Sequence, residues 1–193
     1  YTFTYDATGL LTKSSIKLDG KEYGIETYSY TNGKISKVTY TNTDGSKGIN
    51  NLKYSTAGQI TEFTYETGDP NYDGKQYFEY DANGIMTKRG YADLQGNKYF
   101  EVVIKPVGVA KSPEQLLTNN GLPFDVLTGF SWQTAEGNVG TVYESFYADQ
   151  DGKLVSDSKE KITAVKTNSQ GYIIENTTTD AANKSNTQRF TLT

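Results

Sequence analysis

The stretch YSYTNGKISKVTY, residues 28–40, contains the pattern that decides the fold. Tyr28 and Tyr30 are two residues apart, which places both rings on one face of a strand. Gly33 then marks a turn, after which apolar residues again alternate with polar ones. An apolar face and a polar face on both sides of a glycine turn predict an antiparallel hairpin with one face in water.

This hairpin pattern is repeated along the first half of the chain. Three further segments align with it: FTYDATGLLTKSSI (3–16), LKYSTAGQITEFTY (52–65) and FEYDANGIMTKRGY (78–91). Their glycines form one ladder, Gly9, Gly33, Gly58 and Gly84, and a second ladder is Gly20, Gly45, Gly74 and Gly96. Interleaved, the ladders predict a turn about every 12 residues and about nine strands in the first 105 residues.

The two glycine ladders predict two kinds of turn. Glycines of the first ladder end four-residue turns such as Asp-Ala-Thr-Gly, a position that favours positive φ. The second ladder is mostly Asp-Gly, as in Asp19-Gly20, Asp44-Gly45 and Asp73-Gly74, which is typical of tight hairpin turns. The sequence therefore predicts one turn type at each end of the hairpin array.

Composition narrows the classes of function. Hydrophobic residues make up 35% of the 193 residues, whereas 16 tyrosines contribute to an aromatic content of 13%, so tyrosine replaces aliphatic side chains on the apolar faces. The net charge of −4 and the lack of a basic stripe argue against a nucleic-acid partner. Histidine and cysteine are absent, which excludes Ser-His and Cys-His catalytic pairs and disulfides. No cofactor is expected.

Residues 101–140 interrupt the repeat and contain three of the four prolines. Ser112, Pro113 and Gln115 form a helix start signal, so a short helix is predicted near 113–119. Hairpins resume after the interruption. The predicted organisation is therefore a single β-repeat domain, residues 1–193, with hairpin repeats in 1–100, an interruption in 101–140 and further hairpins in 141–193.

The apolar flanks of this interruption are predicted to cover the apolar side of the sheet, and a ligand-contacting lid is the alternative. Trp132 is the only tryptophan of the chain and lies near Phe130, outside the repeat. Trp132 and Phe130 are therefore the candidate ligand-binding residues, because aromatic side chains combine a large apolar area with a defined geometry, and packing in the core is the favoured alternative for Trp132. No catalytic or metal-binding residue is predicted.

Two groups of acidic residues allow other interpretations. Asp69, Asn71 and Asp73 match the first half of a calcium loop, but loop position 12 is Tyr80 rather than an acid, which favours a hairpin turn without an ion and leaves a weak calcium site open. Neighbouring strands could also supply a hydrolytic pair of carboxylates, for instance two from among Glu62, Glu66 and Glu79. Solvated surface acids are the favoured interpretation.

Two segments resemble a known repeat. Tyr5-Asp6-Ala7-Thr8-Gly9-Leu10-Leu11 and Tyr80-Asp81-Ala82-Asn83-Gly84-Ile85-Met86 look like YD repeats, the Tyr-Asp-x-x-Gly unit of Rhs-type shells. The whole chain is similar to the DUF4595 family of Bacteroidetes envelope lipoproteins. That resemblance implies a porin-like β fold, an upstream signal peptide with a lipidated cysteine, and no assigned activity, so it supplies no site residues.

The predicted fold is all-β: an antiparallel meander of about 12–15 short strands with one short helix in the central insertion, curled into a barrel-like or half-barrel sheet to reduce exposed edges. A flat single-layer sheet is the alternative. The predicted function is a non-enzymatic, monomeric protein of the cell envelope, periplasmic or surface-exposed and lipid-anchored. Its expected partner is a glycan, a peptide or an envelope protein, unless it acts as a scaffold. A small outer-membrane β-barrel and a carboxylate glycoside hydrolase are the alternatives.

Overall fold

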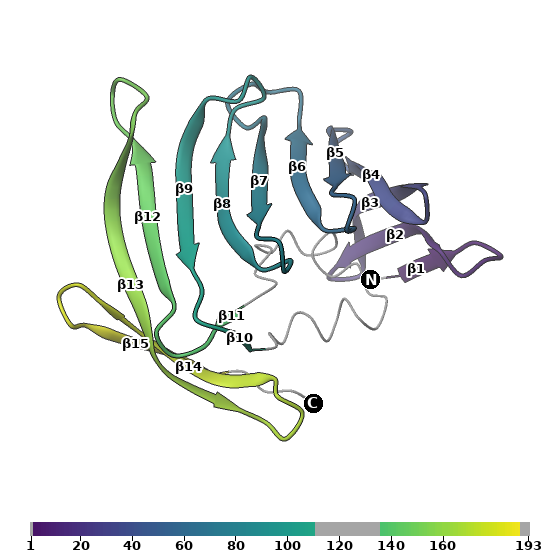
Figure 1. The fold of residues 1–193 in the computed structure, drawn as a ribbon. Helices are drawn as coiled ribbons and strands as arrows, with labels where there is room; N and C mark the ends of the chain where they lie inside the picture. Colours follow the sequence, from purple (N-terminus) through teal and green to yellow (C-terminus); the bar gives the residue numbers. More distant parts are fainter. Residues whose placement is uncertain (1, 111–135, 190–193) are drawn as a thin grey trace. The chain divides into compact units, whose positions relative to one another are not determined.

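A computed structural model describes residues 2–110 and 136–189 (Figure 1). The described residues form fifteen strands and no helix, which confirms the all-β prediction. The strands are β1 (Thr2–Tyr5), β2 (Leu11–Leu18), β3 (Lys21–Thr31), β4 (Lys34–Asn42), β5 (Lys47–Tyr54), β6 (Ile60–Glu66), β7 (Gly74–Tyr80), β8 (Met86–Ala92), β9 (Lys98–Lys105), β10 (Val109–Ala110), β11 (Glu136–Gly137), β12 (Val142–Ala148), β13 (Leu154–Thr167), β14 (Ile173–Asp180) and β15 (Ser185–Arg189). The short helix predicted near 113–119 lies outside the described residues.

Thirteen of these strands form one sheet in the order of the chain, β1 to β9 followed by β12 to β15, which confirms the predicted meander. β12 pairs antiparallel with β9, and Tyr143 is opposite Ile104. β10 and β11 form a separate two-stranded ribbon in which Val109 is opposite Gly137. The predicted interruption is therefore an insertion between two neighbouring strands of the sheet.

The sheet formed by the described strands is open. β1 and β15 are its two edges and do not pair with each other, so the described strands do not close into a barrel, a point that the sequence left open. Both edge strands are short, four and five residues, and all their described side chains are exposed. Short, solvated edge strands limit pairing with other chains, so the sheet does not need to close in order to protect its edges.

Contacts divide the chain into two compact units. Unit 1 consists of Tyr1–Tyr77 and Tyr91–Asn97, and unit 2 consists of Phe78–Gly90 and Lys98–Thr193. Each unit is described by itself below, and the single domain stays a prediction. No helix within the described ranges is long and apolar enough to cross a bilayer.

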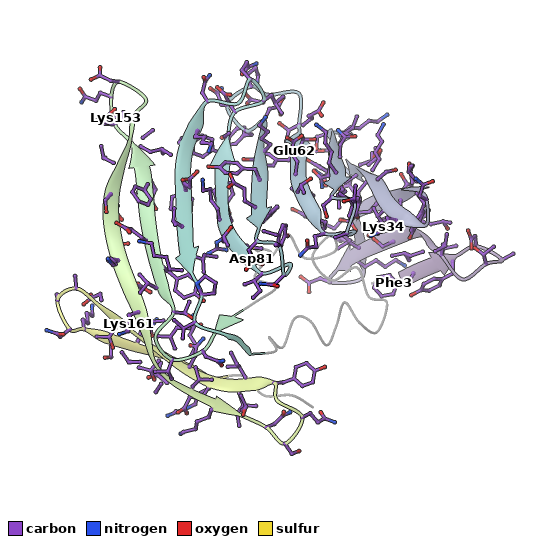
Figure 2. The ribbon with its side chains drawn as sticks, in the orientation of Figure 1. Phe3, Lys34, Glu62, Asp81, Lys153 and Lys161 are labelled. Atoms are coloured by element: carbon purple, nitrogen blue, oxygen red, sulfur yellow. The ribbon has the colours of Figure 1, made fainter. Side chains whose placement is uncertain are left out.

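One four-residue turn is used throughout the meander. At Asp81, labelled in Figure 2, the Oδ1 atom accepts hydrogen bonds from the N–H groups of Asn83 and Ile85, both at 2.9 Å. The main chain closes the turn, because Asp81 N–H donates to Ile85 O and Gly84 N–H donates to Asp81 O. The same main-chain pattern begins at Asp6, Asn42, Ser55, Asp81, Asp93, Asp149, Asn168 and Asp180.

This turn corrects the prediction of one turn type per ladder. Gly45 and Gly96, from the second ladder, end the same four-residue turn as Gly9, Gly58 and Gly84. Two-residue turns occur in both ladders, at Asp19-Gly20 and Asn32-Gly33, where all four residues have φ between 50° and 75°. The two turn types therefore differ in the number of residues between the strands, and neither type is confined to one ladder of glycines. The predicted positive φ of the first-ladder glycines is confirmed.

Gly74 is not a turn residue, which corrects its place in the second ladder. It begins β7 directly opposite Tyr65, and Gly48 on β5 is in the same way opposite Tyr40. A Cβ atom added to Gly48 would lie 2.0 Å from Cζ of Tyr40. The tyrosine ring occupies the place of the missing side chain, an arrangement that compensates for glycine inside a strand.

The tyrosines that precede the turns bind the main chain of the preceding hairpin. The hydroxyl of Tyr30 donates to the carbonyl of Leu11, and that of Tyr54 donates to the carbonyl of Ile35, both at 2.8 Å. Tyr5 stands at the same position of the first hairpin and is 53% exposed. The hydrogen bonds of Tyr30 and Tyr54 each join residues 19 positions apart and link one hairpin to the next.

The two faces of the strands differ in chemistry. One face, here called the apolar face, carries buried residues such as Leu11, Tyr28, Val38 and Leu52 in unit 1 and Met86, Ile104 and Ile162 in unit 2. The opposite face carries ion pairs across neighbouring strands, including Lys53–Glu62 at 2.7 Å and Lys88–Glu79 at 3.4 Å. Exposed pairs of this kind contribute little stability. The burial that supports folding is therefore on the apolar face.

Candidate ligand-binding site

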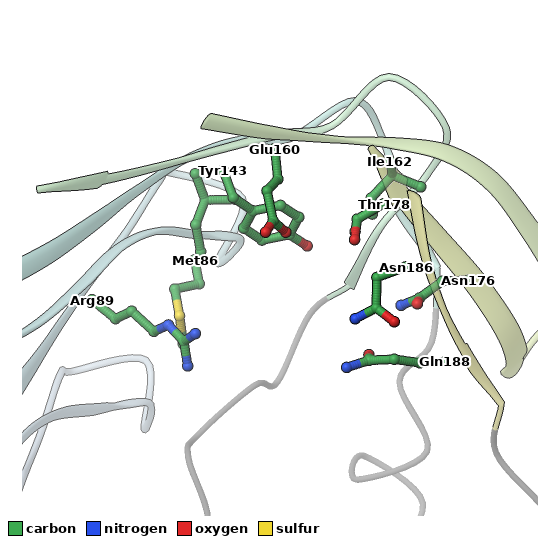
Figure 3. A pocket seen from close by; sticks show the side chains of 10 residues that line it. Met86, Arg89, Tyr143, Glu160, Ile162, Asn176, Thr178, Asn186 and Gln188 are labelled. Atoms are coloured by element: carbon green, nitrogen blue, oxygen red, sulfur yellow. The ribbon is translucent and has the colours of Figure 1, made fainter. Parts of the chain in front are cut away.

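The apolar face of unit 2 contains a pocket of about 150 Å³ (Figure 3). Its described lining residues come from six strands, β8, β9 and β12 to β15: Met86, Arg89, Ile104, Tyr143, Glu160, Ile162, Asn176, Thr178, Asn186 and Gln188. The predicted ligand-binding residues Trp132 and Phe130 lie outside the described residues, so they remain a prediction.

The register of the sheet brings these distant residues together. Tyr143 on β12 is directly opposite Ile104 on β9 and Glu160 on β13. Further along, Thr178 on β14 is directly opposite Ile162 and Asn186. Asn176 is likewise opposite Gln188. Residues directly opposite each other on antiparallel strands project from the same face, so this pairing places the side chains on one continuous surface.

The pocket combines an apolar floor with polar walls. Ile162, Met86 and Ile104 are 0%, 3% and 7% exposed and form the floor. Figure 3 shows the carboxamides of Asn176, Asn186 and Gln188 grouped on one side, with Arg89 beside Met86 on the other. Each carboxamide offers two N–H donors and a carbonyl acceptor. One guanidinium and one carboxylate, from Arg89 and Glu160, give the described lining no net formal charge.

Arg89 departs from the repeat that builds the apolar face. The residue five positions past the turn glycine is Ser14, Val38 and Phe63 in the first three aligned segments, and it is Arg89 in the fourth. A charged residue at a position of the apolar face was therefore a signal in the sequence. Asn176, Asn186 and Gln188 had no such signal, because only the pairing of the strands from β8 to β15 brings them into the same pocket as Arg89.

The acidic loop that resembles a calcium site is held by its own hydrogen bonds. Asp69 Oδ1 accepts from the N–H and the Nδ2 of Asn71, at 3.0 and 2.9 Å. Asp73 Oδ1 accepts from the hydroxyl of Thr67 at 2.9 Å. Within the described ranges, no group of three or more His, Cys, Asp or Glu side chains is placed to hold a metal ion. Internal hydrogen bonds are sufficient to explain this turn.

The acids considered as a hydrolytic pair each have a different partner. Glu62 contacts Lys53 at 2.7 Å and Lys75 at 3.8 Å. Glu66 accepts a hydrogen bond from Asn51 Nδ2 at 2.9 Å, and Glu79 lies 3.4 Å from the ammonium of Lys88. These contacts place the acids within ladders of alternating charge and amide groups on the polar face. Each acid is thus engaged by a lysine or an asparagine.

A second polar cluster, in unit 1, is closed. Ser14 Oγ and the hydroxyl of Tyr28 both donate to Glu26 Oε2, at 2.8 and 2.6 Å. Ser14 is 0% and Tyr28 6% exposed. Burial, together with the hydrogen bond to Glu26, raises the pKa of Tyr28 well above its usual value of 10. Because Ser14 and Tyr28 are buried and both bind the carboxylate of Glu26, this cluster stabilises the fold.

Comparison with known proteins identifies no family. No family model and no curated protein matches the chain. Among solved structures, a porin-like protein from Bacteroides uniformis ATCC 8492 is 10% identical, with a TM-score of 0.36 over 96% of this chain and 84% of that chain. The structure of TcdB2-TccC3-TEV is 14% identical, with a TM-score of 0.32 over 100% of this chain and 12% of that one.

Proposed function

We propose that the chain is a non-enzymatic binding protein of the cell envelope and that the pocket of unit 2 holds a neutral sugar residue of a glycan. The observation that carries this proposal is the group of three carboxamides over an apolar floor. Each hydroxyl of a sugar both donates and accepts hydrogen bonds, and a carboxamide offers both functions in one plane. The C–H groups of a sugar ring would contact Met86 and Ile104, beneath which Ile162 is fully buried.

The charges of the pocket support a neutral ligand over a charged one. Arg89 and Glu160 have opposite charges and line the same pocket. An anionic ligand would be attracted by the guanidinium but repelled by the carboxylate. A cationic ligand would be attracted by the carboxylate but repelled by the guanidinium. A neutral polar ligand can use both groups as hydrogen-bond partners.

The strand order supports a sugar over an extended peptide. Peptides that bind β-sheets usually add a strand to a free edge and pair with its main chain. Five of the six strands that line the pocket, β8, β9, β12, β13 and β14, have a neighbour on both sides, so their main-chain groups are used within the sheet. Recognition in this pocket therefore depends on side chains, as in the binding of a small polar ring.

The carboxylate content supports binding without catalysis. Glycoside hydrolysis usually requires two carboxyl groups on either side of the scissile bond. Glu160 is the only Asp or Glu among the described residues that line the pocket. A single carboxylate can orient a hydroxyl group but cannot serve as both members of such a pair.

The envelope location, with attachment through a lipid anchor, rests on the sequence resemblance to envelope lipoproteins and YD-repeat shells. The open ladder favours a binding protein over an outer-membrane barrel, because a spanning β-structure requires a closed ladder to satisfy its edges. We propose that the protein acts as a monomer. Cell fractionation of the native host would test the location, and recovery of the protein with cytoplasmic markers would contradict it.

The test of sugar binding is calorimetric titration of the chain with glucose, galactose, mannose and N-acetylglucosamine, after a glycan array. We expect at least one neutral sugar to bind and Gln188→Ala to weaken its binding about tenfold, the factor equivalent to the loss of ~1.4 kcal/mol. Gln188 belongs to an exposed edge strand, so its replacement does not disturb the core.

The matched control is Thr187→Ala. Thr187 lies between Asn186 and Gln188, and its side chain projects from the opposite face of β15. We expect this variant to bind the sugar as the wild type does. Binding of only charged sugars or of extended peptides, no binding of any neutral sugar, or equal weakening by Thr187→Ala would each contradict the proposal.

A further inference from the structure

We propose that the sugar site continues along β12 to a second contact, an aromatic platform formed by Phe100, Tyr147 and Val155, and that the ligand is a neutral oligosaccharide. This inference rests on the proposed function, because it adds a second subsite to the same binding face. It also defines the length of the ligand, which the pocket alone does not.

The platform is one row of side chains across three neighbouring strands. Tyr147 on β12 is directly opposite Phe100 on β9 and Val155 on β13. The rings of Phe100 and Tyr147 lie 4.8 Å apart between centroids and are tilted by 49°. Tyr147 is 50% exposed and Val155 42% exposed. Figure 1 shows β9, β12 and β13 side by side, so the row is continuous.

The platform and the pocket share one face. Tyr143, which lines the pocket, and Tyr147 are four residues apart on β12, and an even spacing along a strand returns to the same face. Ile104 and Phe100 have the same relation on β9. A strand rises ~3.3 Å per residue, so about 13 Å separate the two contacts. Ser145 on β12 lies between them, opposite Val102 on β9 and Ser158 on β13.

The chemistry of the platform suits a sugar ring. The faces of neutral pyranose rings carry C–H groups, which pack on aromatic side chains, while the hydroxyl of the tyrosine remains in water. Single exposed apolar side chains are ordinary on protein surfaces. Here an aromatic pair and a valine form one row that is aligned with a polar pocket on the same two strands.

The size of the platform argues against a folded protein partner. Specific protein interfaces bury about 800 Å² on each partner and need 20 or more residues. A row of three side chains is far smaller than that. The span between platform and pocket, about 13 Å, fits a ligand of about three linked sugar rings with one end in the pocket.

The experiment is calorimetric titration of the full chain with cello-, malto- and chito-oligosaccharides of one to four rings. We expect the affinity to rise about tenfold between one and three rings, which corresponds to ~1.4 kcal/mol, and to stay level at four. Tyr147→Ala should abolish this gain and leave the binding of a single ring unchanged, whereas Tyr147→Phe should retain the gain.

Tyr99→Ala is the matched control, because Tyr99 is an exposed tyrosine on the opposite face of β9 and is 44% exposed. It should bind every oligosaccharide as the wild type does. Equal affinity for one and three rings, or a loss of single-ring binding in Tyr147→Ala, would overturn the platform but leave the sugar pocket intact. If no saccharide of any length binds, the proposed function fails and the platform with it.

Discussion

The apolar face is built differently in β2 to β6 of unit 1 and in the pocket-lining strands of unit 2. In unit 1, tyrosines fill the face, and Tyr30 and Tyr54 use their hydroxyls on carbonyls of the preceding hairpin. In unit 2, the corresponding surface carries Arg89, Glu160 and a group of carboxamides around a pocket. The comparison teaches that the same hairpin framework can carry two kinds of face. In one, the polar groups bind one another and the main chain, and in the other, a few side chains line a binding pocket.

The position five past the turn glycine shows this difference most directly. Val38 is 1% exposed and Ser14 is 0% exposed, so both are part of the closed face of unit 1. Arg89 has the same position in its own hairpin and lines the pocket. The main chain of the turn is not responsible, because Gly84 ends the same four-residue turn as Gly9 and has a similar φ, 80° compared with 85°.

The largest effect is expected from breaking the closed face of unit 1. In Gly48→Ala, the new Cβ would lie 2.0 Å from Cζ of Tyr40, so the ring has to leave its place. We expect the free energy of unfolding to fall by ~1–3 kcal/mol, the usual cost of overpacking. Urea unfolding followed by circular dichroism measures this. The same substitution in a Tyr40→Leu background should cost clearly less, and an equal cost in both backgrounds would contradict the role of the ring.

A smaller effect is expected from the hydrogen bonds that link the hairpins. Tyr30→Phe and Tyr54→Phe each remove a hydroxyl that donates at 2.8 Å to a main-chain carbonyl. Each should lower the free energy of unfolding by ~0.5–1.5 kcal/mol. Tyr5→Phe is the control, since Tyr5 has the same repeat position but is half exposed. A cost for Tyr5→Phe equal to that of the other two would show that the linking bonds are not the cause.

The smallest effect concerns the turn that both regions share. Hydrogen bonds from the Nδ2 of Asn97 and from main-chain N–H groups hold the pKa of Asp93 below its usual 3.8. Because the folded pKa is the lower one, the stability due to this charge is present above about pH 4 and is lost as the pH falls through the folded pKa. Asn168 builds the same turn without a charge.

Asp93→Asn should therefore keep the turn and remove this part of the pH dependence. Urea unfolding at about pH 6 and about pH 3 measures the difference in the free energy of unfolding between the two conditions. We expect that difference to be smaller in the variant than in the wild type. An identical decrease in both proteins would mean that the carboxylate of Asp93 does not contribute.

Much of the fold was predictable because its signals are local. A glycine in a left-handed turn and two aromatic residues at a spacing of two are visible within a few positions, so the hairpins, their number and the apolar face follow from the sequence. Gly74 was assigned to a turn, although its role is to make room for Tyr65 on the neighbouring strand. That role depends on a cross-strand pair, which local patterns do not show.

The candidate site was less predictable for the same reason. Its lining residues range from Met86 to Gln188 and meet only through the register of six strands. A bulge in β13 between Ile162 and Ala164 shifts the pairing by one residue, and one such shift decides which residues face the pocket. Arg89 alone was visible in the sequence, as a charge at an apolar repeat position.

The insertion between β9 and β12 has a consequence for how the chain folds. Almost every neighbouring pair of strands is joined by a short turn, whereas 36 residues separate Lys105 from Val142. Closing that connection instead of a four-residue turn costs an additional ~2 kcal/mol of chain entropy. Local contacts form fastest in folding, so the hairpins on either side are expected to form first. The pairing of Ile104 with Tyr143, on which the pocket depends, would then be a late step of folding.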